Sequence, residues 1–231
     1  MSEVVTAPFR RVVLTGVECS GKTTLSKQLA THLGWAWVPE HARTHKEVRS
    51  GQVSESTFDA LHESQTAAAA QAQATHPGVI CDTGDLVLRL WSEAELDFSW
   101  HPLMPPNPRV DLHILCPVLE TWEEDPLRTL PRLEDRLALE AKYRAHLKHR
   151  PHIVAEGDTP EERLKRLESV AMVRAAEVLG VLLNVAYTWL YLNGTLPLAY
   201  LFAALGAMGM GWACWRRNLQ AETLLHLFYF A

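Results

Sequence analysis

RRVVLTGVECSGKTTLSKQLATHL, residues 10–33, decides the fold class of this chain. Residues 10–15 predict a short buried strand, residues 16–23 match the phosphate-loop pattern G-x-x-x-x-G-K-T, and residues 24–33 predict a helix. A strand, a glycine-rich loop and a helix in this order form the phosphate-binding corner of an α/β domain. The stretch therefore predicts that the chain binds a nucleoside triphosphate.

The chemistry of this loop comes from its backbone and from two side chains. The glycines allow backbone N–H groups to turn towards phosphate oxygens, and the helix N-terminus adds a positive field. We expect Lys22 to reach the β- and γ-phosphates of ATP and the Thr23 hydroxyl to ligate Mg²⁺. The loop residues assigned to ATP binding are Gly16, Glu18, Cys19, Ser20, Gly21, Lys22, Thr23 and Thr24.

Four further segments have the apolar character of short strands. They are Trp35–Val38, Val79–Asp82, Val110–Cys116 and His152–Ala155. Helical stretches separate them, notably Glu55–Ala74 and Leu133–His149. Alternating strands and helices with short apolar strands predict an α/β fold, a P-loop kinase-like parallel sheet flanked by helices.

The end of this domain is marked by a helix start signal. Thr159-Pro160-Glu161-Glu162 is a capping box with proline at the first helical position, and we expect its helix to run to about Ser169. The chain of 231 residues has room for one α/β domain and a smaller appendage. We therefore expect a nucleotide-binding domain over residues 1–170.

Composition excludes several classes of protein. The net charge of −5 argues against nucleic acid as the main partner. The four cysteines contain no C-x-x-C pair, which favours a reducing cytosol over a disulfide or zinc framework. Residues 1–8 lack the basic and apolar regions of a secretory signal.

Residues 171–231 differ in character, and we expect them to form a partial transmembrane helical segment. Val178–Leu192 and Leu196–Trp215 carry no charge, and the second approaches the about 20 residues that span a bilayer. Arginines and lysines flank both outer ends while the connector 193–195 is uncharged, which places both ends and the kinase-like domain in the cytoplasm, at the inner membrane. A third apolar segment, Leu219–Ala231, is too short to cross. A soluble helical hairpin is the alternative.

Three sequence signals distinguish a GTPase, a motor ATPase and a small-molecule kinase, and only the kinase signal is present. The guanine-reading [NT]-K-x-D sequence does not occur, and Asp82 is not followed by the glutamate of a motor ATPase. Three arginines, Arg128, Arg132 and Arg136, precede the last predicted strand, where a kinase has a mobile basic lid. Kinase is therefore the favoured class, although a solvated helix face would also explain these arginines.

Several motifs resemble those of ribosylnicotinamide kinases of the NadR type. They are residues 16–24, Glu40-His41-Ala42-Arg43, Cys81-Asp82-Thr83-Gly84 and residues 121–128, TWEEDPLR. The resemblance covers about residues 10–169 and implies a P-loop kinase that uses ATP and Mg²⁺ to phosphorylate nicotinamide riboside in NAD salvage. Together with the loop motif and the basic lid segment, these motifs make Lys22, Asp82 and Arg128 the expected catalytic residues, and we expect Arg132 to bind ATP.

The tail resembles another family. Glu177–Val181, Tyr187–Leu190 and Ala221–Tyr229 are similar to the opening helices of PnuC-type nicotinamide riboside transporters. This resemblance implies a transporter partner and a kinase that traps the entering riboside.

The substrate-binding residues follow from the chemistry of a cationic pyridinium ring and a 5′-hydroxyl. Trp122 and Asp125 offer an indole face and a carboxylate for the ring. Asp82, at a strand end, is expected to orient the hydroxyl or Mg²⁺. Glu40 and Arg43 hold the riboside or the γ-phosphate, or form a structural ion pair. Another small-molecule acceptor, or a membrane-tethered nucleotide sensor, remains an alternative function.

Overall fold

The predicted parallel sheet is present. The computed structural model describes residues 10–96, 98–102, 109–125, 127–194 and 196–216. Its strands lie in the order β2-β3-β1-β4-β5, all parallel. They are β1 (Arg11–Thr15), β2 (Ala36–Val38), β3 (Val79–Cys81), β4 (Leu112–Leu115) and β5 (His152–Val154). The predicted α/β fold of a P-loop kinase is thus confirmed.

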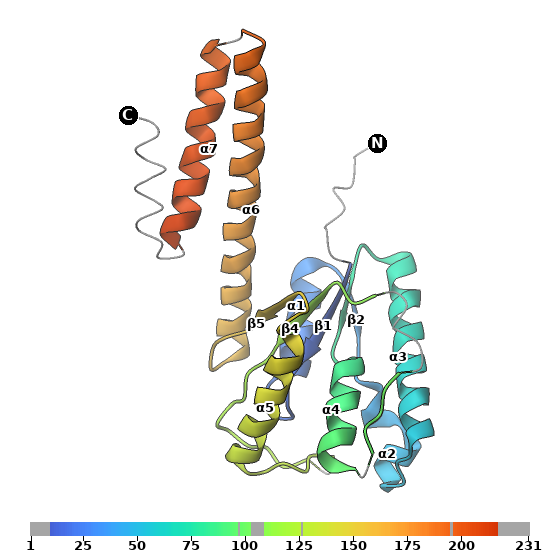
Figure 1. Cartoon of the computed structure of the whole chain (residues 1–231). Coiled ribbons are helices and arrows are strands. Elements are labelled where there is room, and N and C mark those ends of the chain that lie inside the picture. The colour runs from blue at the N-terminus through green and yellow to red at the C-terminus, as the bar shows by residue number, and fades with distance from the viewer. Residues whose placement is uncertain (1–9, 97, 103–108, 126, 195, 217–231) are drawn as a thin grey trace. The chain divides into compact units, whose positions relative to one another are not determined.

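Helices lie on both faces of this sheet, as Figure 1 shows. The helices of the described chain are α1 (Lys22–Leu33), the 3₁₀ turn η1 (His41–Thr44), α2 (Lys46–Ser50), α3 (Glu55–Thr75), α4 (Asp85–Glu95), α5 (Leu133–Leu147), α6 (Pro160–Leu192) and α7 (Leu196–Arg216), of which α7 and most of α6 lie outside the sheet domain. The sequence pattern predicts α1, α3, α5 and α7 but not α4, which begins at Asp85, three residues after Asp82.

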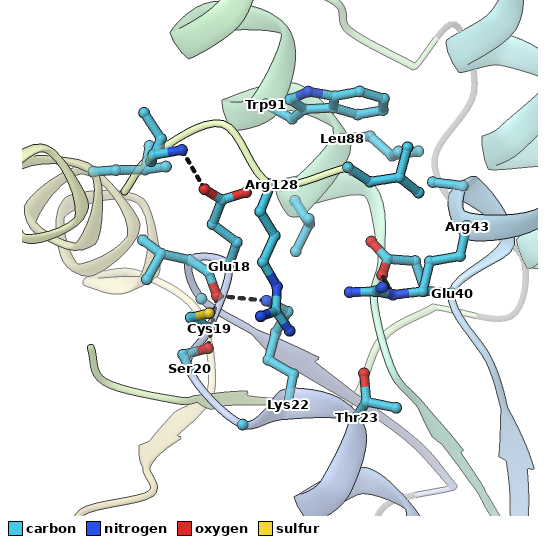
Figure 2. Close-up of a pocket in the computed structure, with 18 of the residues that line it drawn as sticks. Glu18, Cys19, Ser20, Lys22, Thr23, Glu40, Arg43, Leu88, Trp91 and Arg128 are labelled. Atoms are coloured by element: carbon cyan, nitrogen blue, oxygen red, sulfur yellow. Dashed lines mark hydrogen bonds and ion pairs between the residues drawn. The ribbon is translucent and has the colours of Figure 1, made fainter. Parts of the chain in front are cut away.

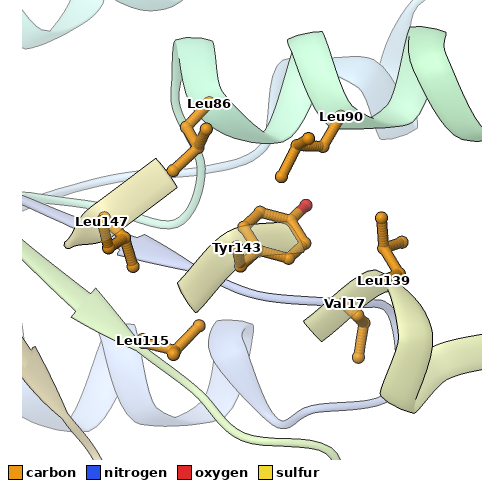
Figure 3. Close-up of a cluster of buried hydrophobic side chains, with 7 residues drawn as sticks. All are labelled: Val17, Leu86, Leu90, Leu115, Leu139, Tyr143 and Leu147. Carbon is orange, nitrogen blue, oxygen red and sulfur yellow. The ribbon is translucent and has the colours of Figure 1, made fainter. Parts of the chain in front are cut away.

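One buried cluster ties the phosphate loop to the helices (Figure 3). Val17, in the loop, is 1% exposed and packs with Leu115 of β4 and with Leu139 and Tyr143 of α5. Burying a side chain of this size contributes about 1.5–3 kcal/mol. The loop is therefore fixed to the domain core as well as to its flanking strand and helix.

Because all five strands are parallel, the sheet brings their carboxyl ends to one edge. The phosphate loop follows β1, Glu40 follows β2, and Asp82 follows β3. The connection from β1 runs to β2 on one side, and the connection from β3 runs past β1 to β4 on the other side. A crevice at such a reversal of strand order is where ligands bind in open α/β sheets. The fold thus gathers the predicted site residues at this edge.

Helix α6 corrects one expectation. Its start is as predicted, because the Glu162 N–H donates to Thr159 Oγ1 at 3.2 Å, while the Glu162 carboxylate accepts from the Asp158 N–H. The helix does not end near Ser169 but runs to Leu192. Residues 161–179 contain no glycine or proline to stop it. The chain divides into two compact units within α6, between Leu164 and Lys165.

In the second unit, α6 and α7 form a hairpin with a close crossing. A Cβ added at Gly180 would lie 2.5 Å from Met210 Cγ and 3.0 Å from the Gly206 carbonyl oxygen. Asn184 lies in the same seam, where its amide donates to the Gly180 carbonyl at 2.9 Å. The two glycines therefore allow these helices to approach at backbone distance, as small residues do in membrane helix pairs.

The two predicted spans differ in length. Leu198–Arg216, in α7, has both the length and the apolar composition for crossing a membrane, and it is the one helix of the described chain that does. The apolar part of α6, Leu179–Leu192, is shorter. The third predicted segment, Leu219–Ala231, lies outside the described residues.

Candidate active site

The phosphate loop has the backbone shape that its sequence predicts. Gly16 and Gly21 have φ of 137° and 74°, in the region that favours glycine, and Cys19 has φ of 56°. A Cβ at Gly16 would lie 2.5 Å from the carbonyl oxygen of Cys116, which follows β4. Any larger residue at position 16 would therefore push the loop away from the sheet.

Two side chains of the loop bind its own backbone. The Ser20 hydroxyl donates to the Val17 carbonyl at 2.7 Å, and Lys22 Nζ donates to the same oxygen at 2.6 Å. Lys22 thus lies along the inner side of the loop, where its ammonium faces the cavity (Figure 2).

A cavity of about 180 Å³ lies over this loop. In Figure 2, the loop residues and Arg128 form one side, Glu40 and Arg43 another, and Leu88 and Trp91 a third. Of the predicted site residues, the cavity is lined by Gly16, Glu18, Cys19, Ser20, Gly21, Lys22, Thr23, Thr24, Glu40, Arg43 and Arg128. Residues that follow β1 and β2 are thus brought together with the segment before α5.

Asp82 lies next to the loop and is 2% exposed. The Thr23 hydroxyl donates to its Oδ2 at 2.7 Å, and the Ser26 hydroxyl donates to its Oδ1 at 3.3 Å. Burial raises the pKa of the Asp82 carboxyl, and the hydrogen bond from Thr23 opposes that rise. The Asp82 carboxylate is therefore fixed next to Thr23, the residue that follows Lys22 in the loop.

Glu40 and Arg43 line the cavity and form a chain of charges with Asp125, which is not a lining residue. Arg43 Nε lies 2.9 Å from Glu40 Oε2, and its Nη1 lies 2.8 Å from Asp125 Oδ2. The backbone N–H of Leu127 and the Arg43 guanidinium lower the pKa of the Asp125 carboxyl. The pair Glu40–Arg43 is thus an ion pair that also lines the cavity.

The segment 123–130 is bound to the loop by loop side chains. The Glu18 carboxylate accepts from the backbone N–H groups of Thr129, at 3.0 Å, and Leu130. The Glu123 N–H donates to Cys19 Sγ at 3.4 Å. Between these two contacts, Arg128 extends towards Lys22 (Figure 2). The predicted lid segment therefore carries one of its arginines over the phosphate loop.

Two predicted binding residues lie away from the cavity. The Arg132 side chain is 72% exposed and pairs with Glu134 and Asp135. Trp122 is half-buried, and the guanidinium carbon of Arg136 lies over its indole ring, 5.3 Å from the ring centre. Arg136 is itself buried and donates to the carbonyls of residues 119–121, so it fixes that segment rather than reaching the cavity.

Two residues of the site were not found from the sequence. Trp91, on α4, is the aromatic side chain that lines the cavity together with Tyr143, and it packs against Phe58 at 4.9 Å between ring centres. An apolar pattern in residues 86–91 directly after Asp82 was the available signal. Arg163, in the first turn of α6, donates to the Ser20 carbonyl behind the loop. No sequence pattern marked it.

Comparison with known proteins agrees with this fold. A family model described as an AAA domain matches residues 11–163. A crystal structure of NadR protein in complex with NR superposes with a TM-score of 0.53 at 15% identity, over 70% of this chain and 50% of that chain. NadR protein in complex with NAD and AMP-PNP gives 0.50 at 16% identity, over 70% and 48%.

A third structure, deoxyadenosine kinase from M. mycoides with products dCMP and a flexible dCDP bound, gives a TM-score of 0.49 at 12% identity, over 70% of this chain and 98% of that chain. No curated protein matches the chain in sequence. The chain matches about half the length of the NadR structures, and at these identities the likeness is one of fold.

Proposed function

This chain belongs to the AAA domain family, and we propose that it is an ATP-dependent kinase that phosphorylates the 5′-hydroxyl of nicotinamide riboside. One observation carries the proposal. The cavity joins a phosphate loop with two cations, Lys22 and Arg128, to an apolar end with an indole, Trp91. A phosphoryl donor and a nucleoside base require these two environments side by side.

The loop end of the cavity supports phosphoryl transfer. Transfer between phosphate and hydroxyl depends mainly on positioning and on charge neutralisation of the transferring group. Lys22 and Arg128 are the cations that line the cavity at this end, and the Glu18 contacts hold the segment carrying Arg128 in place. A guanidinium in this position can bind two phosphate oxygens at once.

The donor set beside the loop fits Mg²⁺. The Thr23 hydroxyl and the Asp82 carboxylate, 2.7 Å apart, are the hard oxygen ligands that this ion prefers. Among the described residues there is no group of three or more His, Cys, Asp or Glu that could hold a metal alone. Mg²⁺ would therefore be bound together with the phosphates of ATP and would reduce their charge, as is usual for kinases.

The apolar end supports a nucleoside with a cationic ring. Trp91 and Leu127 line the cavity and pack against the buried cluster that contains Val48 and Leu88, which line it as well. An indole face attracts a cation through its quadrupole, by about 0.5–2 kcal/mol depending on exposure. Glu40 adds a carboxylate between this end and the loop, where it can accept a hydrogen bond from a ribose hydroxyl. Trp91 thus takes the role that the sequence suggested for Trp122.

The proposal predicts that Trp91→Ala raises KM for nicotinamide riboside by about tenfold, since the ring loses its aromatic contact. KM for ATP should stay within twofold. The measurement is ADP release by the full chain in detergent, with the riboside varied at saturating Mg-ATP.

Trp122→Ala is the matched control, because it removes an indole outside the cavity and should leave the riboside KM unchanged. Equal KM effects of the two substitutions would remove Trp91 from the acceptor site. No ADP release above the rate without riboside, in wild-type protein, would reject this acceptor.

We place the kinase, as residues 1–170, at the cytoplasmic face of the inner membrane, held there by residues 171–231. The hairpin supports this because its large apolar side chains point outward. In the apolar stretch of α7, within Leu198–Arg216, only 28% is buried, whereas the core helix of a soluble protein would be mostly buried. Strongly exposed examples are Trp189, Leu192, Leu201, Met208 and Trp215. A riboside transporter is the partner that the tail resemblance suggests.

Membrane extraction tests this placement. Wild-type full chain is expected in the membrane fraction after an alkaline carbonate wash, because two helices of apolar surface face lipid. Replacing Leu201 and Leu205 together by arginine should release the protein, since each charge costs about 2.5–3.5 kcal/mol in a membrane helix. Leu137→Arg changes an equally exposed leucine of α5 and should have no effect. Release of the wild-type chain by carbonate would contradict membrane insertion.

A further inference from the structure

Arg163 is a buried arginine whose guanidinium joins three loops at the carboxyl edge of the sheet. It is 2% exposed. Its Nε donates to the Gly157 carbonyl at 2.8 Å, one Nη donates to the Pro117 carbonyl at 3.0 Å, and the other donates to the Ser20 carbonyl. These carbonyls follow β5, β4 and β1 in turn, so one side chain connects the phosphate loop to its two neighbouring loops.

The contact with Ser20 has a geometric consequence for the next residue. A trans peptide group is planar, so the C=O of Ser20 and the N–H of Gly21 point in opposite directions. Arg163 binds that C=O from behind the loop, and both Ser20 and Gly21 line the cavity. The Gly21 N–H is therefore turned to the cavity side, where a phosphate oxygen would accept from it.

The charge of Arg163 has little local compensation. Among the described residues, no carboxylate lies within 4 Å of its guanidinium, and its partners there are carbonyl oxygens. Burial lowers the pKa of this guanidinium, while the more distant Asp158 and Glu140 oppose the shift. A buried cation behind the loop adds to the positive potential that the loop presents to an anion.

We propose that Arg163 is the positioning residue of the phosphate loop, which fixes the Ser20–Gly21 peptide with its N–H towards the triphosphate and supplies a buried positive charge behind it. The inference rests on the proposed binding of a triphosphate by this loop. The first turn of α6, which follows the last strand of the sheet, would then contribute to nucleotide affinity.

The sequence offers a selective probe of this peptide. Only two Ser-Gly pairs occur in the chain, Ser20-Gly21 and Ser50-Gly51. Labelling serine carbonyls with ¹³C and glycine nitrogens with ¹⁵N therefore gives two signals in a carbonyl-correlated NMR spectrum of the full chain in detergent. Gly51, at the end of α2 and outside the cavity lining, is the internal control.

Inorganic tripolyphosphate with Mg²⁺ is the ligand, because it reports the loop without the base or the acceptor. In wild-type protein we expect a downfield shift of the Gly21 N–H at saturation and no shift of Gly51. Binding measured by calorimetry without movement of Gly21 would overturn the inference. Absence of binding by tripolyphosphate and by ATP would instead reject the proposed function itself.

Two substitutions separate positioning from folding. Arg163→Lys keeps the charge but cannot reach three divergent carbonyls, and Arg163→Met keeps only the stem. We expect the tripolyphosphate Kd to rise about tenfold for Lys and more for Met, with a reduced Gly21 shift. Lys165→Met, on the exposed side of the same turn, should match wild type. An Arg163 variant with a lower melting temperature but an unchanged Kd for tripolyphosphate would overturn the inference. If neither variant folds, the Gly21 N–H shift of the wild-type protein on tripolyphosphate binding is the deciding measurement.

Discussion

Lys22→Ala is expected to lower kcat for phosphoryl transfer by at least about 10²–10³-fold, the range found when a single charge-stabilising donor is removed from an active site. Lys22 is the loop cation nearest the expected phosphates, and its removal leaves the charge on the transferring group to Arg128 alone among the cavity's loop-side cations. The measurement is riboside-dependent ADP formation at saturating Mg-ATP.

The fold should survive this change, because Lys22 is only half-buried and, in the described part of the chain, its ammonium donates a hydrogen bond to the Val17 carbonyl alone. Circular dichroism and the melting temperature should therefore remain close to wild type. Lys142→Ala, which removes an exposed lysine of α5, is the matched control and should keep full activity. Turnover of Lys22→Ala at the wild-type rate would exclude the mechanism.

Asp82→Asn is expected to reduce kcat by about 10²-fold and to raise the Mg²⁺ concentration needed for half-maximal activity. The substitution keeps the size of the side chain and a carbonyl oxygen for the Thr23 hydroxyl, but it removes the negative charge. A titration of activity with Mg²⁺ at fixed ATP separates the effect on the metal from the effect on the acceptor.

Asp85→Asn is the control for this residue. Asp85 is the next carboxylate along the chain, but it begins α4 and lies 3.8 Å from Arg150 instead of facing the loop. Its substitution should leave both kcat and the Mg²⁺ requirement unchanged. If Asp85→Asn lost activity and Asp82→Asn did not, the assignment of the two carboxylates would be reversed.

The loop and the sheet could be predicted because their signals are local. Residues 10–33 contain a strand, a glycine pattern and a helix in one continuous stretch, and the eight loop residues assigned to ATP binding all line the cavity. The strand order adds Glu40 and Asp82 to the same edge, since each follows a short apolar strand within two residues. In this part of the site, chain connectivity alone determines the neighbours.

The remaining residues depend on how helices and the long segment before α5 pack. Trp122 belongs to a motif that predicted a place for it in the substrate site. Instead, the buried Arg136 donates to the carbonyls of the residues just before Trp122, and its guanidinium covers the indole ring. Trp91 reaches the cavity because Leu86 and Leu90 turn the opposite face of α4 into the core. Arg163 donates hydrogen bonds to backbone carbonyls of three separate loops. Because every residue has a backbone carbonyl, no side-chain pattern in the sequence predicts such contacts.

The anchoring of Val17 has a consequence for the speed and affinity of ligand capture. A side chain locked among Leu115, Leu139 and Tyr143 cannot leave without opening a void in a close-packed interior. The part of the loop around Val17 is therefore ordered before a ligand arrives, and binding loses little free energy to ordering the backbone there. We therefore expect a ligand to associate with this part of the loop without a preceding conformational change.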